Sequence, residues 1–224
     1  LEIMRCFSED IEQNPISRHG VRNMNLLLHG PPGTGKTEFV KFLAAELGLP
    51  LIVRRGSDLL SMWVGGTEHL IKEAFKEAEA ERGILFIDEA DGLIHERSAA
   101  HRNWEVTQVN EFLANMENFR GILVCATNFK KNMDSASIRR FNLKVEFDYL
   151  DDNGKIIFFE KVLGELGGTP LSTDERKELL KSEFLTPGDF KIIRQKNLFI
   201  SKKISNTKLI SELKEEVKAK NNVK

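Results

Sequence analysis

The most constraining feature of this sequence is the octapeptide GPPGTGKT at residues 30–37. It follows a short apolar run at residues 25–29 and precedes a stretch at residues 37–47 whose apolar residues recur with helical spacing. A buried strand that enters a glycine-rich loop and continues as a helix is the context in which the pattern G-x-x-x-x-G-K-S/T binds phosphate. A chance glycine and proline turn is the alternative, and the agreement of motif and context disfavours it.

Each residue type in this loop suits phosphate chemistry. Glycines let successive backbone N–H groups turn inward around phosphate oxygens, and the following helix directs its positive end at the same anion. Lys36 can reach the β- and γ-phosphates, and the Thr37 hydroxyl can hold Mg²⁺. We predict that the nucleotide-binding residues here are Gly30, Pro31, Pro32, Gly33, Thr34, Gly35, Lys36, Thr37 and Glu38.

Two acidic residues, Asp88 and Glu89, follow a second apolar run, ILFI at residues 84–87. In a parallel sheet, the carboxyl end of this strand opens onto the same crevice as the phosphate loop. Asp88 can join the Mg²⁺ shell through water, and Glu89 can polarise a water for in-line attack on the γ-phosphate. An exposed acidic turn is the alternative, and the complete phosphate loop argues against it.

The alternation of strand-like and helix-like periodicity predicts the fold class. We expect an α/β fold with a parallel five-stranded P-loop NTPase sheet between helices, followed by a small all-helical lid subdomain. The expected strands are 25–29, 51–54, 84–87, 122–126 and 143–147. The expected helices are 37–47, 68–82, 104–116, 151–166, 173–181, 188–198 and 208–220. The predicted domains are a nucleotide-binding core at residues 1–150 and a lid with a basic tail at residues 151–224.

Composition excludes several other classes of protein. Lys and Arg number 33 against 34 Asp and Glu, so the net charge of −1 gives no global attraction to nucleic acid or anionic membranes. No apolar run approaches the roughly 18 residues of a membrane-spanning helix, and no signal peptide is recognisable. Two cysteines, Cys6 and Cys125, are too few for a disulfide scaffold, and we expect both to be buried in a cytoplasmic protein. Because the chain begins at Leu1 rather than Met, we expect it to be part of a longer protein.

Positive charge is concentrated at the end of the chain. Residues 191–224 contain ten Lys or Arg and three Glu, a balance of +7. This tail is either a solvated helical surface or a surface that binds a partner.

Four motifs in order resemble those of the AAA+ ATPases, and among these the AAA-type subgroup of protein remodellers. GPPGTGKT matches Walker A, ILFIDEAD matches Walker B, and Ala126-Thr127-Asn128 matches sensor-1, while residues 134–141 (DSASIRRF) resemble the arginine-finger segment. The resemblance covers roughly residues 20 to 200. It implies Mg²⁺-dependent ATP hydrolysis, with Asn128 orienting the attacking water and Arg140, with Arg139 as a second member, reaching a neighbouring subunit's nucleotide.

Alternatives stay open for these residues. Asn128 could instead cap the next turn, and the two arginines could be a solvated surface pair. Many relatives carry a second finger where this chain has Leu143, so either Arg139 is the second member or Arg140 is a single finger.

Residues 61–68 (SMWVGGTE) resemble the family's first pore loop, with Met62, Trp63, Val64 and Gly65 as substrate-gripping residues. Trp63 has no helical or strand period that would place it in a core, although it could pack under its own loop. Most relatives have Tyr or Phe at this position. Residues 95–103 fall where a second pore loop lies, and a solvated loop is favoured there over a metal site at His95 and His101.

The lid contains a further nucleotide-contacting segment. Thr186 is expected to be an N-cap with Pro187 as the first helical residue, and Gly188 and Asp189 resemble the start of the lid helix that closes over adenine and ribose. A sensor-2 arginine is not evident, and Arg194 is a weak candidate. Residues 12–21 would border the adenine.

The predicted function is Mg²⁺-dependent ATP hydrolysis by a homo-oligomer, a hexameric ring in the full-length protein, coupled to threading of a protein substrate. We expect neither nucleic acid nor membrane as a partner. The alternatives are a nucleic-acid motor of the clamp-loader or initiator type, which the basic tail favours, and a nucleotide-gated assembly scaffold.

Overall fold

The computed structural model of the protein describes residues 1–13, 23–63, 65–94, 103–128, 135–167, 170–199 and 203–221. Backbone contacts divide the chain into two compact units. The first comprises Leu1–Gly30 and Lys36–Phe147, and the second comprises Pro31–Gly35 and Asp148–Lys224. The middle of the phosphate loop therefore packs with the helical, C-terminal part of the chain.

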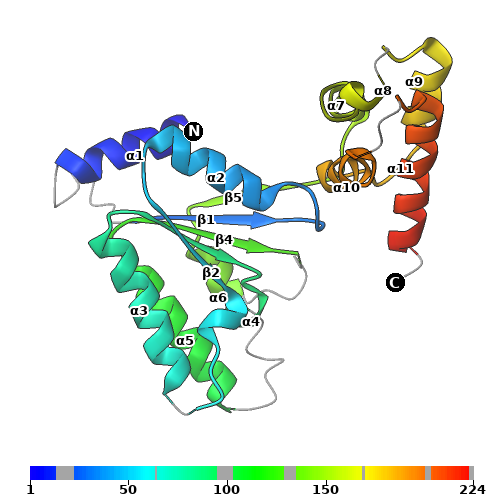
Figure 1. The fold of residues 1–224 in the computed structure, drawn as a ribbon. Coiled ribbons are helices and arrows are strands. Elements are labelled where there is room, and N and C mark those ends of the chain that lie inside the picture. Colours follow the sequence, from blue (N-terminus) through cyan, green and yellow to red (C-terminus); the bar gives the residue numbers. More distant parts are fainter. Residues whose placement is uncertain are drawn as a thin grey trace. The chain divides into compact units, whose positions relative to one another are not determined.

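The first unit is an α/β structure (Figure 1). Its strands are β1 (Met24–His29), β2 (Leu51–Arg55), β3 (Ile84–Asp88), β4 (Ile122–Thr127) and β5 (Leu143–Glu146). Its helices are α1 (Glu2–Gln13), α2 (Lys36–Leu47), the 3₁₀ turn η1 (Gly56–Leu59), α3 (Gly66–Ala80), α4 (Asp91–Ile94), α5 (Asn103–Asn118) and α6 (Ser135–Arg139).

The five strands form one parallel sheet in the order β2-β3-β4-β1-β5, which confirms the predicted fold class. Because β1 and β4 pair with His29 opposite Thr127, the strand that enters the phosphate loop ends beside the strand that precedes Asn128. β4 pairs with β3 on the side opposite β1. The carboxyl ends of β1, β3 and β4 therefore share one edge of the sheet, as expected for a binding crevice.

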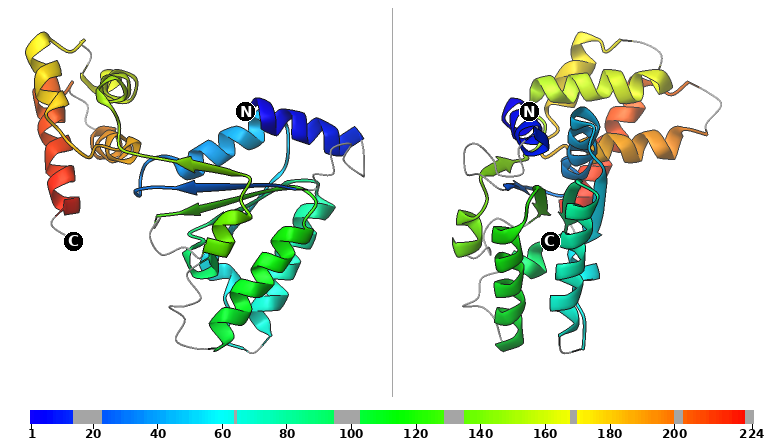
Figure 2. Two further views of the ribbon diagram at one scale, coloured as in Figure 1. Left: turned by 180° about the vertical axis from the view of Figure 1, so that it is seen from behind. Right: turned by 90° about the vertical axis from the view of Figure 1, so that its left-hand side faces the viewer.

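Side chains of the central strands alternate between two hydrophobic cores. Leu85 and Ile87 of β3 enter the core formed with α3 and α5, whereas Ile84 and Phe86 enter the core formed with α1 and α2. Figure 2 shows these helix pairs on opposite faces of the sheet. Burial on both faces explains why the central strands are continuous apolar runs in the sequence.

In its described residues after the phosphate loop, the second unit contains helices and their connections, with no strand. Its elements are α7 (Asp152–Phe158), the π-helical turn η3 (Phe159–Leu163), α8 (Gly164–Gly167), α9 (Thr173–Leu180), α10 (Pro187–Asn197) and α11 (Asn206–Asn221). A separate hydrophobic core, which includes Phe159, Phe190 and Leu213, holds these helices together.

The predicted elements are present, and their ends differ from prediction by no more than two residues. The predicted helix at 151–166 consists of α7, η3 and α8 in succession. The sequence did not indicate α4 and α6, because helices of four and five residues are too short to show a period. It also did not indicate α1, on which Met4 and Phe7 are buried.

The expectation that both cysteines are buried is wrong for Cys6. Met4 and Phe7 lie on the sheet-facing side of α1, which leaves Cys6 exposed to solvent. Cys125 is buried in β4, and this burial raises the pKa of its thiol.

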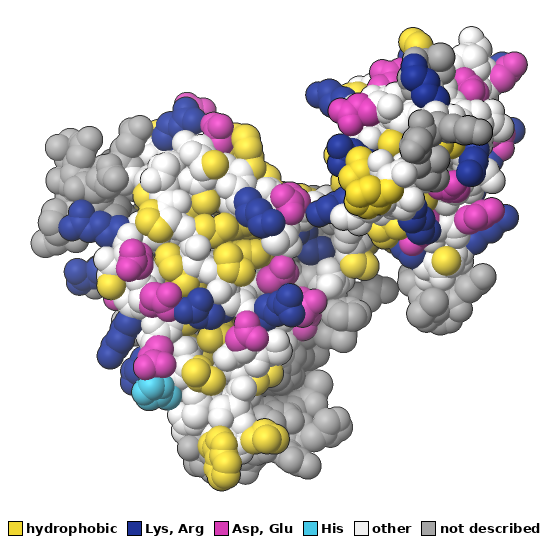
Figure 3. Space-filling view, in the orientation of Figure 1, with side chains coloured by type: hydrophobic (Ala, Val, Ile, Leu, Met, Phe, Trp, Pro, Cys, Tyr) yellow, Lys and Arg dark blue, Asp and Glu magenta, His cyan; other side chains and the backbone are white. Residues whose placement is uncertain are grey.

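Acidic and basic side chains are interspersed over the visible faces of both units (Figure 3). This distribution fits the near-zero net charge.

Candidate active site

The phosphate loop begins at Gly30, where only glycine fits. Gly30 has a φ of 142°, and a Cβ atom at this position would lie 1.8 Å from the carbonyl oxygen of Phe147. The Gly30 N–H donates to the Thr127 carbonyl at 3.3 Å. The loop therefore leaves β1 with its backbone pressed between the strands on either side.

Lys36 links the start of the loop to the end of β4. Its Nζ donates to the Gly30 carbonyl oxygen at 2.7 Å and to Asn128 Oδ1 at 2.9 Å. The residue is only 7% exposed. Burial lowers the pKa of Lys36, and the nearby carboxylates of Asp88 and Asp91 partly offset this effect. Because these hydrogen bonds hold the Lys36 ammonium in place, it is preorganised to bind an anionic phosphate.

Thr37 and Asp88 meet at the edge of the sheet. The Thr37 hydroxyl donates to Asp88 Oδ2 at 2.9 Å. A hydroxyl and a carboxylate are hard oxygen ligands that suit Mg²⁺, which takes one or two protein carboxylates and completes its shell with water and substrate phosphates. The described residues contain no cluster of three or more His, Cys, Asp or Glu that could hold a metal, and this mode of Mg²⁺ binding requires none.

Glu89 stands in a strained turn directly after β3. Its φ of 52° is in the left-handed region, which non-glycine residues rarely adopt and which occurs at functional sites. Its side chain is exposed. A Cβ on Gly56 would lie 2.3 Å from the Glu89 carbonyl oxygen, so the first residue of η1 has to be glycine for this turn to fit.

Asp91 belongs to the site region, although the motif did not lead us to predict a role for it. The Thr127 hydroxyl donates to its Oδ1, and the Ala90 N–H donates to the Ala126 carbonyl at 2.9 Å. These bonds fasten the turn after β3 to the end of β4. The signal was present as the last residue of the run DEAD.

Arg140 is held by its own unit. Its side chain pairs with Glu117 of α5, and its Nη1 donates to the Ala136 carbonyl at 2.8 Å. Asn25 of β1 donates from Nδ2 to the Arg140 carbonyl at 3.1 Å. Arg139 is exposed at the end of α6. The structure thus fixes the backbone and side chain of Arg140 on a frame shared with β1.

The loop before α3 presents two large apolar side chains to solvent. Met62 is 99% exposed and Trp63 is 81% exposed, so Trp63 does not pack under its own loop. The buried Thr67 hydroxyl anchors the start of this loop, because it accepts hydrogen bonds from the Ser61 N–H at 2.9 Å and from Gln108 Nε2 at 3.1 Å. Gly65 is the N-cap of α3.

Several predicted site residues have other surroundings or lie outside the described residues. Glu38 is exposed and pairs with Lys41 on α2 at 3.0 Å, and Arg194 pairs with Glu165 at 3.4 Å. Val64, His95, His101 and Asp134 lie outside the described residues, as does most of the segment expected to border the adenine.

In the second unit, the start of α10 packs on the phosphate loop. The Gly188 N–H donates to the Gly33 carbonyl at 2.9 Å. Thr186 is the N-cap of α10 with Pro187 in its first turn, as predicted. The Asp189 side chain is buried and accepts hydrogen bonds from Thr186 and Lys220. A backbone hydrogen bond thus holds Gly188 against the loop. The Asp189 carboxylate is already engaged by Thr186 and Lys220.

Residues 26–149 match the model of the family described as "ATPase family associated with various cellular activities (AAA)". This match covers more than half of the chain. The chain belongs to the AAA ATPase family. The AAA match agrees with the resemblance based on the four motifs, and it supports an ATPase as the class of enzyme.

Curated relatives match between 163 and 174 residues of this chain. The chain is 32% identical over 164 residues to a spastin of Drosophila persimilis, a match that spans 70% of this chain and 21% of the relative. It is 34% identical over 174 residues to the ATP-dependent zinc metalloprotease FtsH 3 of Symbiobacterium thermophilum, with 73% and 27% covered. A spastin of Ixodes scapularis is 34% identical over 163 residues, with 70% and 25% covered. The matched part therefore spans about a quarter of the length of these curated relatives.

No helix in the described part of this AAA chain combines the length and hydropathy needed to cross a bilayer.

Proposed function

We propose that this chain is the ATP-hydrolysing module of a homo-oligomeric ring, hexameric in the full-length protein, that threads a protein substrate through its centre. The proposal of ATP hydrolysis rests on two hydrogen bonds at the carboxyl edge of the sheet. Lys36 bonds to Asn128, and Thr37 bonds to Asp88, so four residues from three motifs meet directly.

These residues divide the work of phosphoryl transfer. Lys36 and the backbone N–H groups of the loop bind the phosphates, and Asn128, which already touches Lys36, orients the attacking water. Thr37 and Asp88 would hold Mg²⁺, which when bound neutralises charge on the phosphate oxygens. Glu89 accepts the proton of the attacking water.

Arg140 acts on a neighbour's nucleotide in this proposal. Asn25 supports the Arg140 backbone, and the Ala136 carbonyl and Glu117 hold its half-buried guanidinium. A finger of this kind contributes about 10³ to 10⁵ in rate. The pairing with Glu117 keeps Arg140 oriented while no neighbour is present.

Steady-state ATP hydrolysis measured against chain concentration tests this proposal. We expect the activity per chain to rise with concentration, and to fall by about 10² or more in Glu89→Gln with ATP binding retained. Arg140→Ala should lose about 10³. Glu81→Gln and Arg120→Ala, which change exposed residues elsewhere, should keep full activity. ATP binding with negligible turnover at all concentrations would instead favour the assembly scaffold.

The exposed Met62 and Trp63 side chains in the loop before α3 support the proposal that the substrate is a protein. Trp63→Ala should leave the melting temperature and the basal ATP hydrolysis unchanged, because the side chain is 81% exposed. It should abolish stimulation of hydrolysis by a permanently unfolded polypeptide. Phe199→Ala removes a similarly exposed aromatic side chain from the second unit and serves as the control. Stimulation that survives in Trp63→Ala would contradict a gripping role.

The basic tail gives little support to a nucleic-acid motor. Of its ten basic residues, Arg194, Lys196, Lys208, Lys214 and Lys220 pair with carboxylates of the second unit. Phosphate binding would have to break these pairs. Salt-dependent stimulation of hydrolysis by single-stranded DNA would favour that alternative.

We also propose a cytoplasmic location, because both cysteines are free thiols and disulfides are rare in that compartment.

A further inference from the structure

The last turn of α11 reaches the first turn of α10. Lys220 Nζ donates to Asp189 Oδ2 at 2.7 Å, and this carboxylate side chain is only 2% exposed. The same oxygen accepts hydrogen bonds from the Thr186 N–H at 2.8 Å and from the Thr186 hydroxyl at 2.9 Å. The cap of α10 is therefore completed by a cation that comes from the end of the chain.

The residues of this cap also press against the phosphate loop. A Cβ on Gly33 would lie 2.9 Å from Thr186 Oγ1, and a Cβ on Gly188 would lie 3.1 Å from Gly33 Cα. The Gly188 N–H donates to the Gly33 carbonyl at 2.9 Å. With so little space, a shift of the cap has to shift Gly33 or break its hydrogen bond.

Electrostatics makes this cap depend on Lys220. A buried carboxylate is costly unless it is both hydrogen-bonded and paired with a cation. Thr186 supplies hydrogen bonds, and Lys220 supplies the charge. Without Lys220, Asp189 would gain hydration by turning outward, and the first turn of α10 would loosen.

We propose that Lys220 is a positioning residue that couples the C-terminal helix to the phosphate loop through Asp189, Thr186 and Gly188. Displacement of the last turn of α11 then weakens nucleotide binding, so this turn is a control point for the site. The nucleotide part rests on the proposed function, whereas the coupling itself is a property of the nucleotide-free chain.

The α11 helix is built to hold Lys220 in place. Leu209, Leu213 and Val217 are buried in the core of the second unit, and Lys214 pairs with Glu178 of α9. These contacts anchor the helix up to the turn that carries Lys220.

Two measurements on the whole chain test the coupling. The first is hydrogen exchange of the Gly188 amide without nucleotide, and the second is the dissociation constant of a fluorescent ADP. Lys220→Met should speed Gly188 exchange and raise the dissociation constant about tenfold. Lys218→Met removes the same charge from an exposed position of the same helix and should change neither. Lys220→Arg should restore most of both properties.

A second variant, Asp189→Asn, distinguishes loss of the Lys220–Asp189 ion pair from general disruption of α11. In Asp189→Asn, which keeps a cap but removes the buried charge, Lys220→Met should have little further effect on either measurement. Equal Gly188 exchange in Lys220→Met and Lys218→Met would overturn the proposal. If wild type binds no ADP while Lys220→Met still speeds Gly188 exchange, the coupling stands and the nucleotide-binding function fails.

Discussion

At the residue scale, the site depends on backbone positions as much as on charged side chains. The loop can leave β1 only because Gly30 has no side chain to meet Phe147, and Lys36 bonds to the Gly30 carbonyl that this conformation exposes. A glycine that positions a carbonyl for Lys36 is part of the candidate site, although it carries no functional group.

Gly30→Ala should therefore destabilise the fold by about 3 kcal/mol, because it combines a steric clash with a disfavoured φ. Gly48→Ala is the matched control. Gly48 also has a positive φ, 64°, but a Cβ atom there would meet nothing within 4 Å, so only about 1 kcal/mol should be lost. Urea unfolding of both variants measures the difference. Equal losses would show that the contact with Phe147 relaxes freely.

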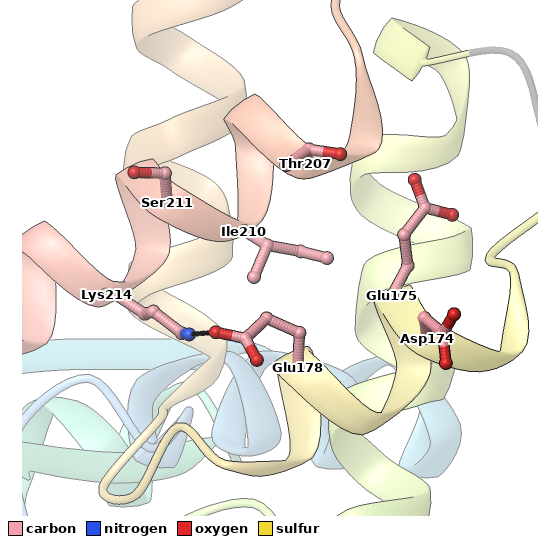
Figure 4. Close-up of a pocket in the computed structure, with 7 residues that line it drawn as sticks. All are labelled: Asp174, Glu175, Glu178, Thr207, Ile210, Ser211 and Lys214. Atoms are coloured by element: carbon pink, nitrogen blue, oxygen red, sulfur yellow. Dashed lines mark hydrogen bonds and ion pairs between the residues drawn. The ribbon is translucent and has the colours of Figure 1, made fainter.

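At the element scale, an ion pair between Lys214 and Glu178 connects α11 to α9 across an open groove of about 430 Å³. Figure 4 shows Glu178 and Lys214 directed toward each other across this groove, with Ile210 between the two helices. Lys214 and Lys181 together lower the pKa of Glu178 to about 2. This pairing favours the packed arrangement of the two helices while Glu178 is ionised.

A pH dependence follows from this lowered pKa. Because the folded pKa lies below the ordinary value of 4.5, the stabilisation is complete above that value and is lost as the pH falls toward 2. Glu178→Gln should thus lower the melting temperature at pH 7, and the difference from wild type should shrink between pH 4.5 and 2. Glu183→Gln, on an exposed residue of the same unit, is the control. A difference that is constant with pH would contradict the ionic origin.

At the scale of the whole molecule, the parallel sheet gathers the residues that we propose for hydrolysis in one chain, whereas Arg140 is held against α5 by Glu117. The proposed function therefore requires a second chain to complete each site. Head-to-tail contacts that close into a ring supply every site with one finger.

Mixing two inactive variants tests this sharing. Glu89→Gln keeps its finger, and Arg140→Ala keeps its hydrolytic residues, so an equal mixture should regain activity at about a quarter of its sites. ATP hydrolysis of the mixture, compared with each variant alone, is the measurement. The double variant mixed with wild-type chain at the same ratio is the control. A mixture with no more activity than its parts would place Arg140 outside the neighbour's site.

Much of the hydrolytic region could be predicted because its residues occupy local motifs at strand ends. Lys36, Thr37, Asp88 and Asn128 were all predicted, and the structure brings them into hydrogen-bond contact. Gly56 was missed because its importance comes from the close approach of Glu89, which is distant in the sequence. Asp91 stands in the run DEAD, but its hydrogen-bond partner Thr127 lies on β4, and only the fold brings the two together.

The sequence by itself determined the AAA family, the parallel sheet and the residues of the phosphate loop, since each is written in a short run of neighbouring residues or in a simple period. Only the tertiary structure decided that Trp63 is exposed, that Arg140 pairs with Glu117, and that Lys220 completes the cap beside Gly33. Burial and charge pairing depend on which distant residues the packed helices bring together, and no local pattern of the chain records that choice.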